Sequence, residues 1–327
     1  MTARARIVAM GASSEEPVPG LEAVEDVAEV VPAATAEEVA AALSGADVLL
    51  AWRPHADLLR PAWDRAGDLK WVQAASAGVD GLLFRELIES PVVVTNARGV
   101  FDEAIAEYTL GLLLLFAKGF PATLERQRAR DWRPRETERL EGRRLLVVGA
   151  GPVGHAIGRA AGRLGMIVRA VARTPRPGNQ VFRVVYGRDE LAEACGWADV
   201  VVDALPSTPE TRHAFDAGVF AAMRPHARFV NIGRGATVDE EALVAALREG
   251  ALAGVALDVF EREPLPPDSP LWDLPNVIVS PHMAGTSAGW REAVVELFLE
   301  NLERYLTGRP LRNVVDKGLG YVPAGGR

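Results

Sequence analysis

The feature that most constrains this 327-residue chain is a glycine-rich turn between two apolar segments. Residues 145–148 lead into Gly149-Ala150-Gly151-Pro152-Val153-Gly154, and small residues typical of a helix packed on a sheet follow as far as Leu164. A second apolar segment covers residues 166–172. In the order strand, turn, helix, strand, the pattern G-x-G-x-x-G predicts a dinucleotide site, because its glycines allow a tight turn, close approach of a pyrophosphate and helix–strand packing. Amide groups at the start of the helix would face the phosphates. Glycines outside this context would indicate only an ordinary turn.

Composition narrows the class of protein. The length corresponds to about two domains, and a 49% hydrophobic content is enough for two cores. A net charge of −8 argues against nucleic acid as a partner. A single cysteine, Cys195, excludes an internal disulfide and fits a reducing compartment. The apolar run at residues 110–117 is far shorter than a membrane span of about 20 residues, and the one at residues 7–10 is too short for a signal peptide. We therefore expect a soluble cytoplasmic protein with no membrane partner.

The first hundred residues alternate between apolar strand-like segments and helical segments. Strands are expected at residues 6–10, 47–52, 69–74 and 92–95, and a capping box formed by Thr35 and Glu38 predicts the start of a helix. This alternation favours a parallel sheet covered by helices. The loop at residues 76–80 follows a strand directly, where open α/β sheets place ligands. An ordinary strand-to-helix connection is the alternative for that loop.

A long helical segment begins near Asp102. Its apolar residues recur at helical spacing, and residues 110–116 are apolar on more than one face. This pattern indicates burial against a second domain or subunit. A charged helix is expected from Leu124 to Asp131.

The second half of the chain contains strands that end in polar residues. They are expected at residues 199–204, 228–232, 254–258 and 277–280. In a doubly wound sheet the carboxyl ends of the strands share one edge, so Arg234, Asp258 and His282 should converge there. The final helix is expected from Trp290 to Leu306, followed by a Gly/Pro-rich tail that we expect to be poorly ordered.

Five segments together resemble the D-isomer-specific 2-hydroxyacid dehydrogenases. They are residues 149–154, 205–213, 230–235, 257–265 and 280–282, with looser matches at residues 77–80 and 96–100. The resemblance implies an α/β fold of two doubly wound parallel-sheet domains. A Rossmann dinucleotide-binding domain, residues 100–290, would be inserted into a discontinuous flavodoxin-like substrate domain, residues 1–99 and 291–327. It also implies an active site in the cleft between the domains, and a homodimer.

The resemblance assigns catalytic roles to three residues. Arg234 would hold the carboxylate and carbonyl oxygens of a 2-oxo acid, which a planar guanidinium suits better than an ammonium group. His282 would be the general acid/base, and Glu263 would orient its ring and stabilise its protonated form. Each residue alone is compatible with an ordinary structural role. In these motifs together they predict a catalytic site.

The resemblance also implies contacts with cofactor and substrate. The expected cofactor-binding residues are Gly149, Gly151, Pro152, Val153, Gly154, Arg173, Thr174, Arg176, Leu205, Pro206, Thr211, Ile232, Gly233, Asp258 and Gly285. Among them, Asp258 would hold the nicotinamide carboxamide. The expected substrate-binding residues are Ala77, Gly78, Val79, Arg234 and His282. The amides of Gly78 and Val79 would meet the substrate carboxylate, and no metal is expected.

One departure from the family pattern concerns the choice of cofactor. NAD-using relatives end the second strand of the nucleotide domain with an aspartate that holds the ribose hydroxyls, whereas this chain has Ala172. Arg173, Thr174 and Arg176 follow, and they can donate charge-assisted hydrogen bonds to a 2′-phosphate. We therefore expect NADP(H) to be preferred and NAD(H) to be possible. A solvated basic loop is the alternative.

These expectations combine into one hypothesis for function. The chain is expected to be an NADP-preferring 2-oxoacid reductase or D-2-hydroxyacid dehydrogenase, similar to glyoxylate/hydroxypyruvate reductases, acting on a small 2-oxo or 2-hydroxy acid. One alternative is an NAD-linked enzyme like phosphoglycerate dehydrogenase. Another is a non-enzymatic, nucleotide-sensing module like the corepressors that share this fold. The trio of Arg234, Glu263 and His282 disfavours the second alternative.

Overall fold

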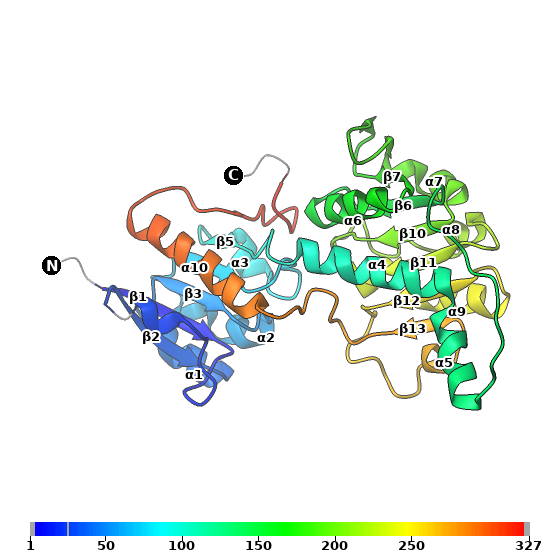
Figure 1. Ribbon diagram of the computed structural model, residues 1–327. Coiled ribbons are helices and arrows are strands. Elements are labelled where there is room, and N and C mark those ends of the chain that lie inside the picture. Colours follow the sequence, from blue (N-terminus) through cyan, green and yellow to red (C-terminus); the bar gives the residue numbers. More distant parts are fainter. Residues whose placement is uncertain (1–3, 25, 324–327) are drawn as a thin grey trace. The chain divides into compact units, whose positions relative to one another are not determined.

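The computed structural model describes residues 4–24 and 26–323. The chain divides into two compact units, residues 1–101 with 288–327, and residues 102–287 (Figure 1). Among the described residues, no single helix combines the length and apolar character needed to cross a membrane. The helices α4 (Asp102–Lys118) and α5 (Phe120–Ala129) meet that test only as a pair bent by 60°.

The first unit is built on a five-stranded parallel sheet with the strand order β2-β1-β3-β4-β5. This order is that of flavodoxin-like sheets, so the predicted class of the substrate domain is confirmed. The strands are β1 (Ala5–Met10), β2 (Ala28–Ala33), β3 (Val48–Ala51), β4 (Trp71–Ala74) and β5 (Val93–Thr95). The helices are α1 (Ala36–Leu43), α2 (Ala56–Leu59), α3 (Arg85–Glu89) and α10 (Trp290–Leu306). The sequence did not predict β2, an edge strand that contains Pro32; proline weakens a strand pattern and is tolerated at sheet edges.

Helices cover both faces of this sheet. Alternate residues of a strand point to opposite faces, and Val8 and Met10 of β1 pack with α1, α2 and α3. Ile7 and Ala9 pack instead with α10. The rings of Trp71 and Phe298 stack there at 5.4 Å. The last helix therefore completes the core of the unit that contains the first strands.

The expectation of a poorly ordered tail is wrong for residues 309–323. Val315 is buried, and the isolated bridge between Thr95 and Val314 joins the tail to the end of β5. Lys317 Nζ donates at 2.6–2.9 Å to three carbonyl oxygens around the end of α3, those of Leu87, Ser90 and Val92. Burial lowers the pKa of Lys317. Glycine and proline content misled the prediction because these long-range contacts leave no local pattern, and residues 324–327 lie outside the described residues.

The second unit is built on an eight-stranded sheet with the order β13-β12-β11-β10-β6-β7-β9-β8. Its strands are β6 (Arg144–Val148), β7 (Ile167–Val171), β8 (Arg176–Pro177), β9 (Val184–Tyr186), β10 (Val200–Asp203), β11 (Arg228–Asn231), β12 (Gly254–Leu257) and β13 (Val277–Val279). Its helices are α4 (Asp102–Lys118), α5 (Phe120–Ala129), α6 (Pro152–Arg163), α7 (Leu191–Trp197), α8 (Ala217–Ala222) and α9 (Glu240–Arg248). All pairs are parallel except the short β8, which is antiparallel to β9. The predicted Rossmann architecture is confirmed, although the sequence missed the β8–β9 hairpin because its strands have two and three residues.

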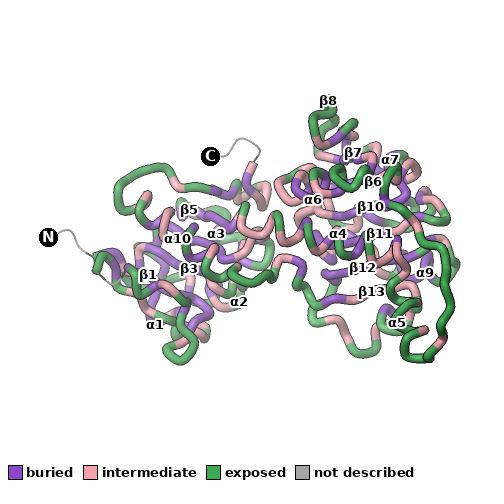
Figure 2. Tube along the Cα trace, in the orientation of Figure 1, coloured by how far each residue is buried: buried purple, intermediate pink, exposed green. Residues whose placement is uncertain are grey.

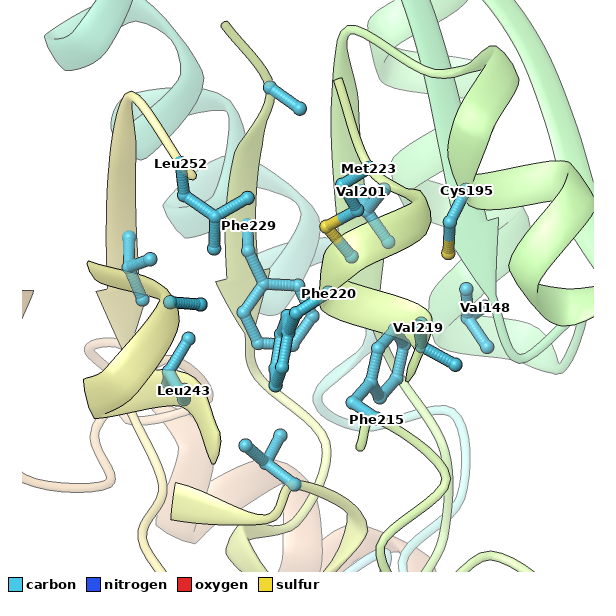
Figure 3. Packing of buried hydrophobic residues seen from close by; sticks show 14 of the residues in the cluster. Val148, Cys195, Val201, Phe215, Val219, Phe220, Met223, Phe229, Leu243 and Leu252 are labelled. Atoms are coloured by element: carbon cyan, nitrogen blue, oxygen red, sulfur yellow. The ribbon is translucent and has the colours of Figure 1, made fainter. Parts of the chain in front are cut away.

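Two apolar layers enclose this sheet, and buried residues concentrate along its strands (Figure 2). On one face, Leu145 and Val147 pack with α4 and α6. On the other, Leu146 and Val148 pack with α7, α8 and α9. Figure 3 shows the centre of the second layer, where Phe215, Phe220 and Phe229 meet, with ring centroids 4.8 Å apart for Phe215–Phe229 and 5.6 Å for Phe220–Phe229.

The strand register aligns the carboxyl ends of five strands. Val148, Asp203, Asn231, Leu257 and Val279 are successive register partners across the sheet. The residues that follow them therefore emerge along one edge, which is where ligands bind in open α/β sheets.

Candidate active site

The glycine turn between β6 and α6 has the geometry that a dinucleotide requires. Gly149 has φ +111°, and a Cβ there would lie 2.6 Å from the carbonyl oxygen of Ala204. A Cβ on Gly154 would lie 2.0 Å from the carbonyl oxygen of Gly149. A Cβ on Gly151, in contrast, would meet nothing within 4 Å. Packing therefore requires glycine at 149 and 154, whereas Gly151 borders open space at the start of α6. Pro152 occupies the first turn of that helix.

Three polar residues follow β7 on the same edge of the sheet. Arg173, Thr174 and Arg176 are all exposed. Arg176 Nη2 donates to the carbonyl oxygen of Ala150 at 3.5 Å, so its guanidinium lies beside the glycine turn. This arrangement places a positively charged hydrogen-bond donor, the guanidinium of Arg176, close to the expected phosphate groups.

The loops after β10 and β11 lie backbone to backbone. A Cβ on Gly233 would lie 2.7 Å from the carbonyl oxygen of Leu205. Thr211 Oγ1 donates to the carbonyl oxygen of Pro206 at 2.6 Å, so this predicted cofactor contact also fixes the shape of its own loop. Ile232 is buried beside them.

His282 and Glu263 form a close pair. His282 Nδ1 lies 2.7 Å from Glu263 Oε2, and Glu263 Oε1 accepts from the amide of Phe260 at 3.0 Å. Burial raises the pKa of Glu263, but the hydrogen bonds from His282 and Phe260 and the charges of His282 and Arg234 outweigh it and hold that pKa below its usual value. An ionised carboxylate thus faces Nδ1, so Nε2 is the ring nitrogen that can exchange a proton with a ligand.

The turn that carries His282 is held by Asp258. The carboxylate of Asp258 accepts from Ser280 Oγ at 2.7 Å and from the amides of Met283 and Ala284 at 3.0 and 2.8 Å. His282 itself has φ +50°, in the left-handed region that few non-glycine residues adopt. Three of about four lone-pair sites on this carboxylate are therefore occupied by the protein. The sequence did not predict this role of Asp258. Gly285, another predicted cofactor-binding residue, lies directly after the turn.

Arg234 precedes a 3₁₀ turn, Gly235–Thr237. Its Nη1 donates to the carbonyl oxygen of Gly233 at 2.7 Å. A Cβ on Gly235 would lie 1.8 Å from the carbonyl carbon of Phe260, so this turn packs directly against the segment that leads to Glu263. The structure thus brings Arg234, Glu263 and His282 together on the edge of the sheet that the sequence indicated. In this arrangement the charge of Arg234 lowers the pKa of Glu263.

The remaining predicted site residues belong to the first unit, in the loop after β4. Asn96 Nδ2 donates to the carbonyl oxygen of Ala77 at 2.5 Å, and Ser76 Oγ donates to that of Gly78 at 2.5 Å. Among the residues that the structure describes, no hydrogen bond uses the amide of Gly78 or Val79 as its donor. The two contacts from Asn96 and Ser76 hold the loop through its carbonyl groups.

The fold and site together define a class of dinucleotide-dependent dehydrogenases. A family model described as D-isomer specific 2-hydroxyacid dehydrogenase, NAD binding domain, matches residues 110–284. The chain belongs to the D-isomer specific 2-hydroxyacid dehydrogenase family, which confirms the predicted resemblance and the predicted class of enzyme.

Individual relatives differ in how much of their length the chain covers. A D-3-phosphoglycerate dehydrogenase from Methanocaldococcus jannaschii is 33% identical over 305 residues, which are 92% of this chain but 57% of the relative. A glyoxylate/hydroxypyruvate reductase A from Serratia proteamaculans is 31% identical over 285 residues, covering 84% of this chain and 88% of the relative. The crystal structure of an NADPH-dependent glyoxylate/hydroxypyruvate reductase from Sinorhizobium meliloti, in complex with NADP and sulfate, has a TM-score of 0.84 at 30% identity and covers 98% of this chain and all of that one.

Proposed function

We propose that this protein transfers a hydride between NADP(H) and a small 2-oxo acid or D-2-hydroxy acid. The observation that carries the proposal is the contact of 2.7 Å between His282 and Glu263, beside Arg234 and on the same sheet edge as the glycine turn. The glyoxylate/hydroxypyruvate reductases among its relatives support a substrate of this class.

In this proposal each side chain has a separate task. Arg234 binds the substrate carboxylate and carbonyl oxygen, because its planar donors match two acceptors at once. His282 Nε2 gives a proton to the carbonyl oxygen during reduction and takes it back during oxidation. Glu263 compensates the charge on the imidazolium, and the amides of Gly78 and Val79 bind the carboxylate. A nicotinamide cofactor, when bound, would supply or accept the hydride.

We further propose that NADP(H) is the preferred cofactor and that NAD(H) can replace it. The glycines at 149, 151 and 154 would accommodate the pyrophosphate, and Arg173, Thr174 and Arg176 would surround the 2′-phosphate. The exposure of these last three residues and the position of Arg176 beside the turn support this assignment.

The direct test is a panel of 2-oxo acids, including glyoxylate, hydroxypyruvate and phosphohydroxypyruvate, assayed with NADPH and with NADH. We expect oxidation of NADPH with at least one of the unphosphorylated acids. Turnover confined to NADH and the phosphorylated acid would favour the phosphoglycerate-dehydrogenase alternative. Tight nucleotide binding without any turnover would favour a nucleotide-sensing module.

Replacing Glu263 with Gln should narrow the pH range of reduction. The ionised carboxylate stabilises the protonated imidazole, so its loss should move the alkaline limb of the kcat profile to lower pH. A pH series of initial rates measures the shift. Glu261→Gln is the matched control, since Glu261 pairs with His213 at 2.7 Å and has no proposed catalytic role. If the alkaline limb of the kcat profile does not move in Glu263→Gln, a group other than Glu263 must orient His282.

Replacing Arg234 with Lys should raise the KM for the 2-oxo acid by about tenfold and also slow turnover. Lysine keeps the charge but loses one of two parallel hydrogen bonds to a charged group, each of which contributes about 1.5–3 kcal/mol. Steady-state kinetics with varied 2-oxo acid measures this effect. Unchanged substrate kinetics would show that the carboxylate is held elsewhere.

We propose that the protein is a cytoplasmic homodimer that associates through the region of α4 and α5. Large apolar side chains are exposed there, with Phe120 and Leu124 at 49% and Trp132 at 98%, and clustered exposure of this kind marks an interaction surface. Sedimentation at micromolar concentration should give twice the 35.1 kDa mass of one chain. Leu124→Asp should shift the equilibrium to monomer, whereas Val27→Asp, at a site equally exposed in the other unit, should not. A monomeric native protein would refute the dimer.

A further inference from the structure

A buried carboxyl group that the proposed chemistry does not use lies at the end of β10. Asp203 is fully buried, and its Oδ1 accepts from the amide of Leu205 at 2.9 Å. Its Oδ2 contacts the hydroxyl of Thr237. Asp203 therefore touches both the loop that carries Leu205 and the 3₁₀ turn that follows Arg234.

The number of protons that the cluster can share determines whether Asp203 is neutral or ionised. Thr237 Oγ1 contacts Asp203 Oδ2 and also lies 2.6 Å from the carbonyl oxygen of Arg234. A hydroxyl has one proton to donate, and a carbonyl oxygen can only accept. Both contacts are hydrogen bonds only if Thr237 donates to Arg234 and accepts from a protonated Asp203. The resulting chain runs from the acid through the hydroxyl to the backbone of Arg234.

The surroundings of Asp203 favour the neutral acid. Burial raises the pKa of Asp203 to about 7, although the hydrogen bonds that an ionised Asp203 would accept from Thr237 and Leu205 act in the opposite direction. On α7, the titratable group nearby is the Cys195 thiol. Burial, together with the charge that Asp203 carries when it is ionised, raises the pKa of this thiol to about 12, so the thiol stays neutral. The neighbouring strands contribute Val148 and Asn231, and the guanidinium of Arg234 donates to Gly233.

We propose that Asp203 is a positioning residue which, as a neutral acid, holds the backbone of Arg234 in place through Thr237. The inference rests on the proposed role of Arg234 in binding the substrate. Asn231 Nδ2 also donates to the Arg234 carbonyl oxygen, at 3.0 Å, so the acid adds a second side-chain tether. When Asp203 ionises, the proton of Thr237 turns to the carboxylate and the Arg234 carbonyl loses that tether. Substrate binding then weakens as the pH rises.

The decisive variant is Asp203→Asn, because an asparagine keeps one acceptor for Leu205 and one donor for Thr237 but cannot ionise. We would measure KM and kcat for the 2-oxo acid from about pH 6 to about pH 9, on both sides of the value of about 7. In the native enzyme KM should rise several-fold over this range. In Asp203→Asn, KM should stay nearly constant, while the pH profile of kcat should match that of the native enzyme.

Variants at Thr237 supply matched controls. Thr237→Val removes the hydroxyl with little change of shape and should give, at every pH, the raised KM that the native enzyme reaches only at high pH. Thr237→Ser restores the hydroxyl and should restore the native profile. The same pH dependence of KM in the native enzyme and in Asp203→Asn would overturn the proposal, and so would a native profile in Thr237→Val.

A measurement without substrate separates this inference from the proposed function. A carboxyl group whose pKa is higher in the folded state than in the unfolded state stabilises the fold at low pH and loses that contribution as the pH rises through the folded value. Between about pH 4 and about pH 7, the Tm of the native protein should therefore fall progressively below that of Asp203→Asn. A constant difference would show that Asp203 holds no proton and would overturn the inference. Absence of turnover with every 2-oxo acid would refute the proposed function instead, whatever the Tm values show.

Discussion

His282→Ala should lower kcat by about 10²–10⁴-fold, the usual contribution of a positioned general acid, with little change in the Kd for NADPH. The reason is that the ring faces Glu263 through Nδ1 and offers its other nitrogen to the carbonyl oxygen of the substrate. The glycine turn and the loops after β7 and β10, which we expect to bind the nucleotide, do not depend on the imidazole. Stopped-flow or steady-state rates and a fluorescence titration of NADPH measure the two effects.

The backbone at His282 requires a second variant. With φ +50°, alanine there would be strained, whereas asparagine tolerates the left-handed region. His282→Asn should therefore show the loss of catalysis with less disturbance of the turn that Asp258 holds. His213 is a matched control, because it also has a positive φ, +49°, and a glutamate partner; His213→Asn should keep most of the activity. More than half of the native kcat in His282→Asn would contradict the assignment.

The main features of the nucleotide unit could be predicted from the sequence because they depend on local pattern. The glycine turn needs glycine at 149 and 154 for packing within a short strand–turn–helix segment. The shared edge of the strand ends follows from parallel pairing alone, so residues 234 and 282 could be expected to converge without any knowledge of the side-chain contacts. The capping box at Thr35 is equally local, and the structure shows both of its hydrogen bonds.

Contacts between distant segments could not be predicted in this way. Asp258 holds a turn through partners 22–26 residues away, and nothing in the strand that it follows shows which side chains will meet it. Asp203 looked like one more polar strand end until the structure placed Thr237 and the Arg234 carbonyl against it. A buried carboxyl group becomes informative only when its partners are known, because burial and hydrogen bonding shift its pKa in opposite directions.

Substitutions at the two positions directly after β7, Ala172 and Arg173, should strongly change the choice of cofactor. Arg173 is exposed and follows Ala172, which offers no carboxylate to a ribose. A hydrogen bond to a charged group contributes about 1.5–3 kcal/mol, so Arg173→Ala should lower kcat/KM for NADPH by about tenfold or more, mainly through KM. Arg163→Ala is the matched control, because Arg163 is an exposed arginine at the far end of α6 from the glycine turn and should leave both cofactors unaffected.

Adding Ala172→Asp to Arg173→Ala should reverse the preference. A carboxylate at position 172 can accept hydrogen bonds from the ribose hydroxyls of NADH, and it repels the 2′-phosphate of NADPH. Both changes weaken the binding of the 2′-phosphate, so together they should shift the ratio of kcat/KM for NADPH to kcat/KM for NADH by about 100-fold or more. The kcat values should change little, because the nicotinamide end of the cofactor is untouched. Titrations of both cofactors at a fixed concentration of 2-oxo acid measure the ratio. If the native enzyme has the same kcat/KM with NADH as with NADPH, Arg173 belongs to a solvated loop, and Arg173→Ala will change the KM of neither cofactor.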